Sequence, residues 1–366
     1  MYQGEDSGDL PFYKVGDIAA NVIAGNDCLS FCNNYISYDV AKEIKGSILP
    51  KDVVVFAKIG EALKLNRRAI TTCNCLIDNN AMGIAAKPSV LDVRYFFYFM
   101  KSVKMEEHSE STTVPSVRKS KLENIEITVP DIQEQQQIAA TLDKLQSIIA
   151  HRKQQLAKLD ELVKARFVEM FSEIDLTPQR AEWIPISSIG TVIGGSTPKT
   201  SVEEYWDGDL KWITPAELLP DTGYLYDSVR KITKAGVDSC SLQLLPKDTV
   251  ILTSRAPIGK VAIAGTEMYC NQGFKNIICN DTVLPRYLYS LLLYNVDYLN
   301  SLGRGATFKE ISKSIVEKIK IPIAPIEQQN QFAAFVEQTN KSKVAVQKSL
   351  DEAQVLFDSL MQEYFG

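Results

Sequence analysis

Histidine is nearly absent from this chain of 366 residues, which contains only His108 and His151. There are seven cysteines, none in a C-x-x-C pair, and their odd number argues against a secreted disulfide framework. The cysteines are Cys28, Cys32, Cys73, Cys75, Cys240, Cys270 and Cys279. The close pairs among the first four could each be half of a zinc site. With two histidines in the whole chain, however, the partners for such sites are missing, and we expect no bound metal.

Long apolar runs are also missing. No stretch reaches the roughly 20 apolar residues of a membrane-spanning helix. The N-terminus, MYQGEDSGDL, has neither the basic nor the apolar region of a signal peptide. We therefore expect a cytoplasmic protein with no membrane partner. The composition, 45% hydrophobic and 23% charged, is ordinary for domains with a core, and the length suggests two or three domains.

Catalytic signatures are missing as well. We find no Asn/Asp-Pro-Pro-Tyr/Phe loop of adenine methyltransferases and no G-x-x-x-x-G-K-[ST] phosphate loop. Pro130-Asp131 resembles the start of a nuclease motif, but no acid-x-lysine follows it in a strand. The sequence thus predicts that the chain is not an enzyme and carries no cofactor of its own.

An excess of basic charge is the last absence, because the formal net charge is −5. Residues 1–130 hold 15 Lys and Arg against 16 Asp and Glu, and residues 183–320 hold 15 against 14. Both parts are therefore near neutral. Any surface that binds nucleic acid has to be local.

What the sequence does contain is a long heptad repeat between Pro130 and Phe171. Polar residues fill the positions between its apolar members. The predicted seam consists of Leu142, Leu145, Ile149, Leu156, Leu159, Val163 and Met170. Apolar residues at this spacing predict one long helix with a coiled-coil seam. A long surface helix packed on its own domain is the plainer alternative.

The same pattern closes the chain 194 residues later, where Glu327-Gln328-Gln329 aligns with Gln133-Glu134-Gln135. Both helices follow a short apolar segment that ends in proline. The second seam consists of Val336, Val346, Leu350, Phe357, Leu360 and Tyr364. Lys343 stands where the first copy has Ile149. A single polar position of this kind can fix the register of a coiled coil at some cost in stability.

The globular parts before the two helices repeat as well. Leu49–Asp52 followed by Val53–Phe56 matches Leu245–Asp248 followed by Thr249–Leu252. A period this long indicates duplication of a whole domain rather than a solenoid. The sequence therefore predicts four segments, which are residues 1–129, 130–172, 173–323 and 324–366.

Inside each globular part the pattern favours short strands with one main helix. The expected strands are Lys51–Lys58, Ala69–Asp78, Leu122–Val129, Thr249–Ser254, Gly259–Ala264, Tyr269–Cys279 and Val316–Ile323. The expected helices are Val93–Val103 and Pro285–Leu299, whose aromatic stripes are typical of a core. Ser172–Arg180 is expected to be a polar linker.

The second half carries a series of short motifs in a fixed order. They are Trp183–Ile186, Gly194–Pro198, Glu204–Gly208, Leu210–Thr214, Leu245–Ile263, Asn271–Phe274 and Ile321–Gln329. Each is weak alone. In this order, and partly repeated in the first half, they resemble the DNA-specificity subunit of type I restriction-modification systems. The resemblance covers nearly the whole chain.

The resemblance implies an α+β protein with two mixed α/β target-recognition domains in tandem, each followed by a long helix. The two helices would pair as an antiparallel coiled coil. Each domain would read one half of a bipartite target in double-stranded DNA. The expected partners are two methyltransferase (modification) subunits, which would bind S-adenosylmethionine, and restriction (nuclease-translocase) subunits.

The DNA-binding surface should come from loops that bear donors for phosphates and base edges. In the second domain the candidates are Thr197, Lys199, Thr200, Lys211, Trp212, Thr214, Ser254, Arg255, Lys260, Asn271, Gln272 and Lys275. In the first domain the matching positions give Lys14, Lys58, Lys64, Arg67, Arg68, Asn79 and Asn80. The pair Ser254-Arg255 leads this set, because it follows a predicted buried strand at the mouth of a loop.

The first half departs from the family pattern at its start. It begins at the equivalent of residue 200 and lacks a counterpart of Trp183–Lys199. Phe12 stands where the second half has Trp212, and Asp17 where it has Glu217. Either the coding start lies upstream, or the gene is trimmed or recombined. We expect the missing strand to leave a sheet edge unpaired, with apolar neighbours exposed.

Two other functions remain open from the sequence. A catalytic DNA enzyme would need an active site that the motifs do not supply. The second is a coiled-coil scaffold with two ligand-binding domains that acts without DNA. Binding of a methyltransferase subunit would separate this scaffold from a specificity subunit.

Overall fold

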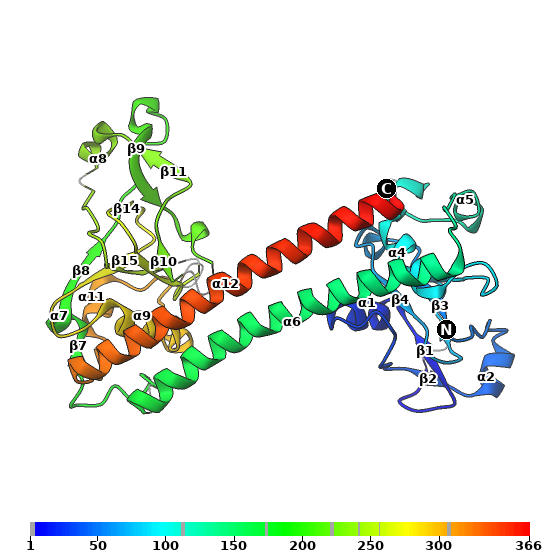
Figure 1. Ribbon diagram of the computed structural model, residues 1–366. Coiled ribbons are helices and arrows are strands. Elements are labelled where there is room, and N and C mark those ends of the chain that lie inside the picture. Colours follow the sequence, from blue (N-terminus) through cyan, green and yellow to red (C-terminus); the bar gives the residue numbers. More distant parts are fainter. Residues whose placement is uncertain are drawn as a thin grey trace. The chain divides into compact units, whose positions relative to one another are not determined.

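The computed structural model describes residues 4–110, 114–172, 175–219, 223–240, 242–255, 257–305 and 309–366. The chain divides into two compact units (Figure 1). Unit 1 comprises residues 1–156 and 345–366, and unit 2 comprises residues 157–344. Each unit therefore contains part of both long helices.

Unit 1 is built from two small sheets and short helices. Its strands are β1 (Leu10–Tyr13), β2 (Tyr35–Ile36), β3 (Val53–Ala57), β4 (Arg68–Ile70), β5 (Leu76–Ile77) and β6 (Ala81–Ala85). Its helices are α1 (Val15–Ile23), α2 (Tyr38–Glu43), α3 (Glu61–Lys64), α4 (Val93–Ser102), a 3-10 turn (Met105–His108) and α5 (Lys119–Leu122). The strand orders are β2-β1-β5 and β4-β3-β6. Central strand β3 is buried along its whole length, because its residues pack on both faces.

Unit 2 has a larger main sheet of five strands in the order β10-β13-β12-β15-β8. Its strands are β7 (Ile184–Pro185), β8 (Gly190–Gly194), β9 (Trp206–Ile213), β10 (Tyr224–Leu225), β11 (Arg230–Ile232), β12 (Val250–Leu252), β13 (Val261–Ala264), β14 (Tyr269–Cys270), β15 (Lys275–Cys279) and β16 (Lys320–Ile321). Its helices are α7 (Ile186–Ile189), two 3-10 turns (Glu203–Tyr205 and Pro215–Glu217), α8 (Lys234–Ser239), α9 (Pro285–Leu293), α10 (Val296–Ser301) and α11 (Lys313–Lys318). Smaller sheets have the orders β11-β9-β14 and β16-β7.

The two long helices are α6 (Ile132–Phe171) and α12 (Ile326–Phe365), each of 40 residues, as the heptads predict. Within unit 1, Ile149 and Leu156 of α6 form an apolar cluster with Leu350, Ala353 and Phe357 of α12. Every predicted seam residue is buried or half-buried, although an amphipathic helix on its own domain would also bury one face.

Within unit 2 the same two helices meet through other residues. The ring of Phe167 in α6 lies edge-on to Phe332 in α12, with 5.0 Å between centroids. The polar break in the second seam has a partner, because Lys343 forms an ion pair with Asp160 of α6. Lys343 therefore adds an ion pair to the contact between the two helices and does not interrupt that contact.

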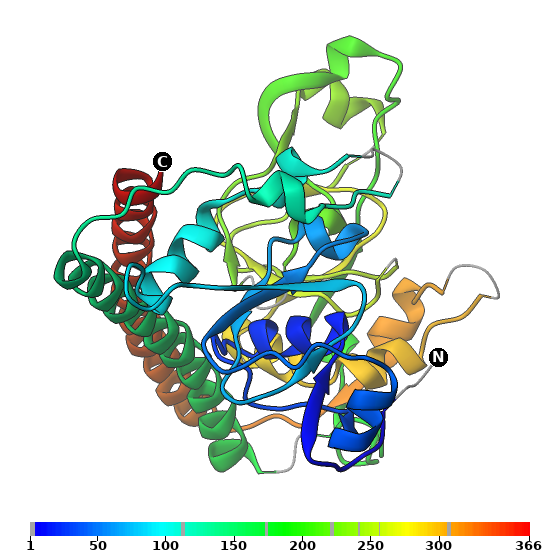
Figure 2. The same ribbon diagram turned by 90° about the vertical axis from the view of Figure 1, so that its right-hand side faces the viewer.

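Helix α4 of unit 1 and helix α9 of unit 2 carry the aromatic stripes, and both are core elements, as predicted. Tyr95, Phe97 and Tyr98 of α4 and Tyr287 of α9 are almost fully buried. Tyr95 donates from its hydroxyl to the carbonyl of Thr128 at 3.0 Å, and α4 lies between the strands and α6 (Figure 2). These aromatic side chains are therefore unavailable for stacking on bases.

Several predicted elements are wrong in their extent. Ala69–Asp78 and Tyr269–Cys279 are each two strands in different sheets, rather than single strands. In the second case the side chain of Asn271 accepts from the N–H of Gly273 at 2.8 Å and turns the chain between the strands. The turn residues Asn271-Gln272-Gly273 are themselves a sign of the break in the second segment.

The predicted strands that lead into the long helices are also wrong in part. Leu122 ends α5, and no strand is described from 123 to 129. Val316 belongs to α11, and only Lys320–Ile321 is a strand. The helix expected over Pro285–Leu299 is broken after Leu293, where the Asn295 amide donates to the carbonyl of Leu291 at 2.7 Å.

Candidate nucleic-acid interface

Four loops of unit 2 converge beside the ends of β8, β9, β12 and β15. The N–H of Ser196 donates to the carbonyl of Cys270 at 3.0 Å, and the Thr197 hydroxyl donates to the side-chain oxygen of Gln272. Gly195 permits this approach, because a Cβ there would lie 2.1 Å from the carbonyl oxygen of Asn271. The Gly194–Pro198 motif is therefore needed for close packing of two loops.

The other two loops join through backbone and lysine contacts. The N–H of Ser254 donates to the carbonyl of Gly273 at 2.7 Å, which ties the 254–260 loop to the 271–275 loop. Lys260 donates from Nζ to the carbonyl of Pro215 at 3.2 Å. We call the surface formed by residues 195–200, 214–217, 254–255, 257–260 and 271–275 the loop cluster.

A small charge network joins two of these loops to Glu310. Lys275 donates from Nζ to the Ser254 hydroxyl at 3.2 Å and to a carboxylate oxygen of Glu310 at 3.3 Å. Arg255 approaches the other oxygen of the same carboxylate at 3.9 Å. Two cations thus share one acid, and this part of the surface keeps a positive excess that can attract phosphate.

Most candidates in unit 2 are accessible at this surface or near it. Lys199, Thr200 and Gln272 are exposed, and Thr197, Lys211, Thr214, Arg255, Lys260, Asn271 and Lys275 are partly exposed. Thr214 caps a turn, because its N–H donates to Glu217 Oε1 at 2.7 Å. Asn271 shapes its own turn, as described above. These two side chains therefore position the loops.

Two candidates in unit 2 are wrong as direct contacts. Ser254 is fully buried, because its loop begins under the 271–275 loop, and it supports Lys275 instead. Trp212 is 2% exposed, donates from Nε1 to the carbonyl of Ser196 at 3.0 Å, and lies edge-on to Trp206. It is a core residue under the loop cluster.

Arg68 in unit 1 is also wrong as a contact with DNA. It is 2% exposed, donates to the carbonyls of Met100 and Val103, and lies 4.8 Å from the ring centre of Phe56. Burial lowers the pKa of Arg68 to about 10. Its remaining donors bind the carbonyl of Arg67 and the side chain of Asn66, so Arg68 holds α4 against β4.

The remaining unit 1 candidates occupy three places. Lys14 donates to the Asn34 side chain at 3.0 Å, beside Asp17, which accepts from the Lys14 N–H much as Glu217 accepts from Thr214. The N–H of Lys58 donates to the carbonyl of Asn80 at 2.8 Å, so these two candidates are neighbours. Exposed Lys64 pairs with Glu61. Exposed Asn79 and half-buried Arg67 complete the set.

Two exposed arginines of unit 2 were not predicted from the sequence. Arg230 lies 3.7 Å from the ring centre of Trp206, at the edge strand β11. Arg304 is joined by backbone hydrogen bonds to Glu310, the acid that Arg255 and Lys275 share. No short motif marks either arginine. Only the pairing of distant segments shows that they belong with the candidates.

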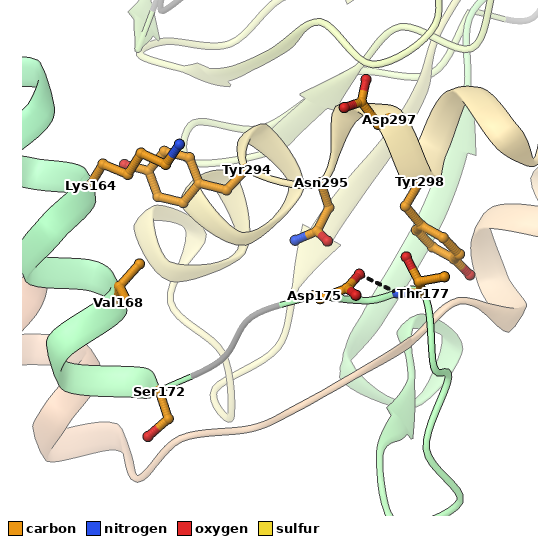
Figure 3. Close-up of a pocket in the computed structure, with 9 residues that line it drawn as sticks. All are labelled: Lys164, Val168, Ser172, Asp175, Thr177, Tyr294, Asn295, Asp297 and Tyr298. Atoms are coloured by element: carbon orange, nitrogen blue, oxygen red, sulfur yellow. Dashed lines mark hydrogen bonds between the residues drawn. The ribbon is translucent and has the colours of Figure 1, made fainter.

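One hollow of unit 2 lies elsewhere, where α6 runs into the linker (Figure 3). It has a volume of about 420 Å³. Its lining consists of Lys164, Val168, Ser172, Asp175, Thr177, Tyr294, Asn295, Asp297 and Tyr298. The carboxylate of Asp175 accepts from the N–H of Thr177 at 2.8 Å, so it caps the linker turn. No cluster of metal-ligating side chains occurs among the residues that the structure describes.

A family model decides what these units are. The model of the type I restriction modification DNA specificity domain matches residues 3–161 and 178–353. The chain belongs to this family. The match extends over both halves, so it agrees with the internal duplication and confirms the resemblance drawn from the motifs.

Curated relatives carry names of the same kind. The chain is similar to the type I restriction enzyme MjaIX specificity subunit of Methanocaldococcus jannaschii, with 43% identity over 181 residues. This aligned region covers 48% of this chain and 42% of the relative. The putative MjaX specificity subunit of the same organism is 23% identical over 74% of this chain and 68% of its own length. The chain thus spans less than half of the first relative.

Solved structures share the fold. The type I restriction-modification S subunit from M. genitalium aligns with a TM-score of 0.59 and 16% identity, over 100% of this chain and 92% of that one. A structure described as the basis of complex assembly and conformational transition of the type I R-M system aligns with a TM-score of 0.61 and 17% identity, over 97% and 91%. No helix in the described ranges is long and apolar enough to cross a membrane.

Proposed function

We propose that the chain is a non-catalytic specificity subunit that reads a bipartite target in double-stranded DNA. The observation that carries this proposal is the duplication of one family domain, with polar loops in unit 2 that expose Lys, Arg, Gln and Thr around a shared acid. Such donors hold phosphates and read base edges.

The two long helices would set the distance between the domains. The early part of α6 meets the late part of α12 in unit 1, and the reverse holds in unit 2. Contacts of this order support an antiparallel coiled coil along both helices. A helix of 40 residues is about 60 Å long, so the two half-sites would be separated by several unread base pairs.

Chemistry would come from partner subunits. Two modification subunits, one for each repeat of domain and helix, would bind S-adenosylmethionine and methylate adenine. Restriction subunits would join the same scaffold. In this assignment the four segments 1–129, 130–172, 173–323 and 324–366 are two recognition domains and two spacer helices.

Binding experiments with and without a modification subunit test the proposal. The purified chain alone should neither bind S-adenosylmethionine nor methylate DNA. Adding a modification subunit should give sequence-dependent methylation, measured by transfer of tritiated methyl groups. Light scattering of the complex should give two modification subunits per chain. Methyl transfer by the chain alone, with contaminants excluded, would contradict the proposal. A chain that binds neither the modification subunit nor DNA would favour the scaffold alternative.

A further inference from the structure

Arg230 is an exposed residue of β11, the edge strand of the β11-β9-β14 sheet of unit 2 (Figure 1). Its guanidinium lies over the ring of Trp206, with 3.7 Å between Cζ and the ring centre. This separation is van der Waals contact. An upright guanidinium would push a nitrogen into the ring, so the planar group lies nearly flat on the indole. The contact therefore fixes the plane of the guanidinium as well as its place.

Trp206 is a fixed platform for this arginine. It is 7% exposed and belongs to a core cluster with Trp212, Ile232 and Val237. The ring of Trp212 meets it edge-on, with 5.1 Å between centroids. Nε1 of Trp206 donates to the carbonyl of Lys199 at 3.3 Å. The platform is thus joined to the 195–200 loop of the loop cluster.

A shift in the pairing of β9 with β11 brings Trp206 to this position. A regular ladder would place Leu210 opposite Ile232, but the register shifts after Lys231 and Trp206 stands there instead. Irregularities of this kind increase the local twist and re-aim side chains. The shift in register therefore brings the indole beside Arg230.

The backbone at Arg230 is held to a second loop of the cluster. The Ser228 hydroxyl accepts from the N–H of Trp212 at 3.0 Å and donates to the carbonyl of Arg230 at 2.6 Å. The N–H of Val229 donates to Glu217 Oε2 at 2.7 Å. Both the backbone and the guanidinium of Arg230 are therefore fixed from the protein side.

The donors of this guanidinium remain open. Within the described ranges, no oxygen accepts a hydrogen bond from the Arg230 side chain. The nearest acid along the chain, Asp227, lies 3.7 Å from Lys231 instead. The contact with Trp206 occupies a face of the guanidinium and none of its N–H groups, which point outward in the plane. A fork held in one plane suits a ligand that offers two acceptors side by side.

We propose that β9 and β11 enter the major groove as a two-stranded ribbon and that Arg230 binds O6 and N7 of one guanine. The major groove admits such a ribbon, and an arginine on these two acceptors is the commonest specific contact. A phosphate contact needs only charge, which exposed Lys199 supplies on the neighbouring loop. The inference rests on the proposed function and adds to it one base in the half-site that unit 2 reads.

Duplexes containing 7-deazaguanine test this contact, because the modified base lacks the N7 acceptor. The full chain, assembled with a modification subunit, is titrated with its mapped target carrying the modified base at one guanine at a time. Replacement at one guanine should weaken binding about fivefold or more. In Arg230→Ala that replacement should have no effect, while the effects at other guanines persist. Arg230→Lys keeps the charge but lacks the fork, and should lose the same effect.

Arg286→Ala is the matched control. Arg286 also packs on aromatic rings, 4.8 Å from the ring centre of Tyr224 and 5.1 Å from that of Tyr289. It lines a hollow beside α12 rather than the loop cluster. This variant should keep the effect of 7-deazaguanine at every position, which separates loss of a base contact from loss of an arginine on a ring.

Three results would overturn the proposal. The first is an effect of 7-deazaguanine that is the same in Arg230→Ala and the unmodified chain. The second is equal weakening of all sequences by Arg230→Ala with a smaller salt dependence, which marks a phosphate contact. The third is a target without guanine. An unmodified complex that prefers no sequence would instead contradict the proposed function, and this inference with it.

Discussion

Gln135 and Gln329, which are 194 residues apart, play the same part in the two units. Both are fully buried near the start of a long helix. The side-chain oxygen of Gln135 accepts from the N–H of Asp92 at 2.8 Å. Its amide nitrogen donates to the carbonyls of Pro130 at 2.8 Å and Val90 at 3.0 Å.

Gln329 repeats each of these bonds in unit 2. It accepts from the N–H of Leu284 at 2.8 Å and donates to the carbonyls of Ala324 at 2.8 Å and Thr282 at 3.2 Å. One glutamine in each unit thus joins the start of the long helix to the loop before the main aromatic helix. This explains the one buried glutamine in the first turn of each long helix.

Replacement of either glutamine should destabilise the chain. Gln135→Leu and Gln329→Leu each remove the side-chain partner of three backbone groups, and we expect a loss of about 1–3 kcal/mol in the free energy of unfolding. Gln133→Leu, at an exposed position of the same helix turn, should have little effect. Urea unfolding followed by circular dichroism checks this. A stable Gln135→Leu variant would show that the bonds do not anchor the helix.

Arg255 should contribute to DNA binding by the assembled complex. Arg255→Ala should weaken binding by roughly 1–3 kcal/mol if the guanidinium reads a base, and alter preference in one half-site only. Glu310→Gln should strengthen non-specific binding, because it releases the positive charge of both Arg255 and Lys275.

Anisotropy titrations at several salt concentrations measure these effects. Lys341→Ala is the control, since this exposed lysine lies on α12 and forms an ion pair with Glu337 of the same helix. If Arg255→Ala binds every sequence as the unmodified chain does, the loop cluster is not the reading surface.

The buried thiol of Cys270 should make stability depend on alkaline pH. Burial raises the pKa of Cys270 from 9.0 to about 12. The folded chain therefore keeps the thiol proton that the unfolded chain loses above pH 9, and stability falls as pH rises from 9 towards 12. The share of this thiol is about 1.4 kcal/mol by pH 10. Urea midpoints at pH 8 and pH 10 should fall less in Cys270→Ala than in the unmodified chain, and an unchanged difference would exclude this cause.

Lengthening a long helix should change the target spacer. Four residues inserted near Arg152–Gln155 add about 6 Å of helix, which corresponds to one or two base pairs. The half-sites should stay the same. Some loss of stability is expected because the insertion interrupts the heptad frame. Sequencing of the sites methylated by the insertion variant measures both half-sites and the spacer. A changed half-site with an unchanged spacer would contradict the spacer role.

Local patterns predicted the long helices and the duplication well. Heptad positions from Leu142 to Met170 depend only on spacing along one helix, so the sequence suffices for them. The aromatic stripe of Val93–Val103 was interpreted correctly for the same reason.

Positions that depend on distant pairing could not be predicted in this way. Trp212 is buried because Trp206 and Ser196 meet it across two loops. Arg68 is buried because carbonyls at the end of α4 take up its donors. A polar or aromatic residue in a loop motif carries no sign of such partners, and both residues were therefore assigned to the surface.

Mapping of methylated adenines tests the central claim most directly. The chain, assembled with a modification subunit, would be supplied with genomic DNA and S-adenosylmethionine, and methylated positions would be sequenced. We expect two short words separated by a fixed number of unread base pairs, with Arg255→Ala altering only one word. A single contiguous word, or methylation without sequence preference, would contradict the account.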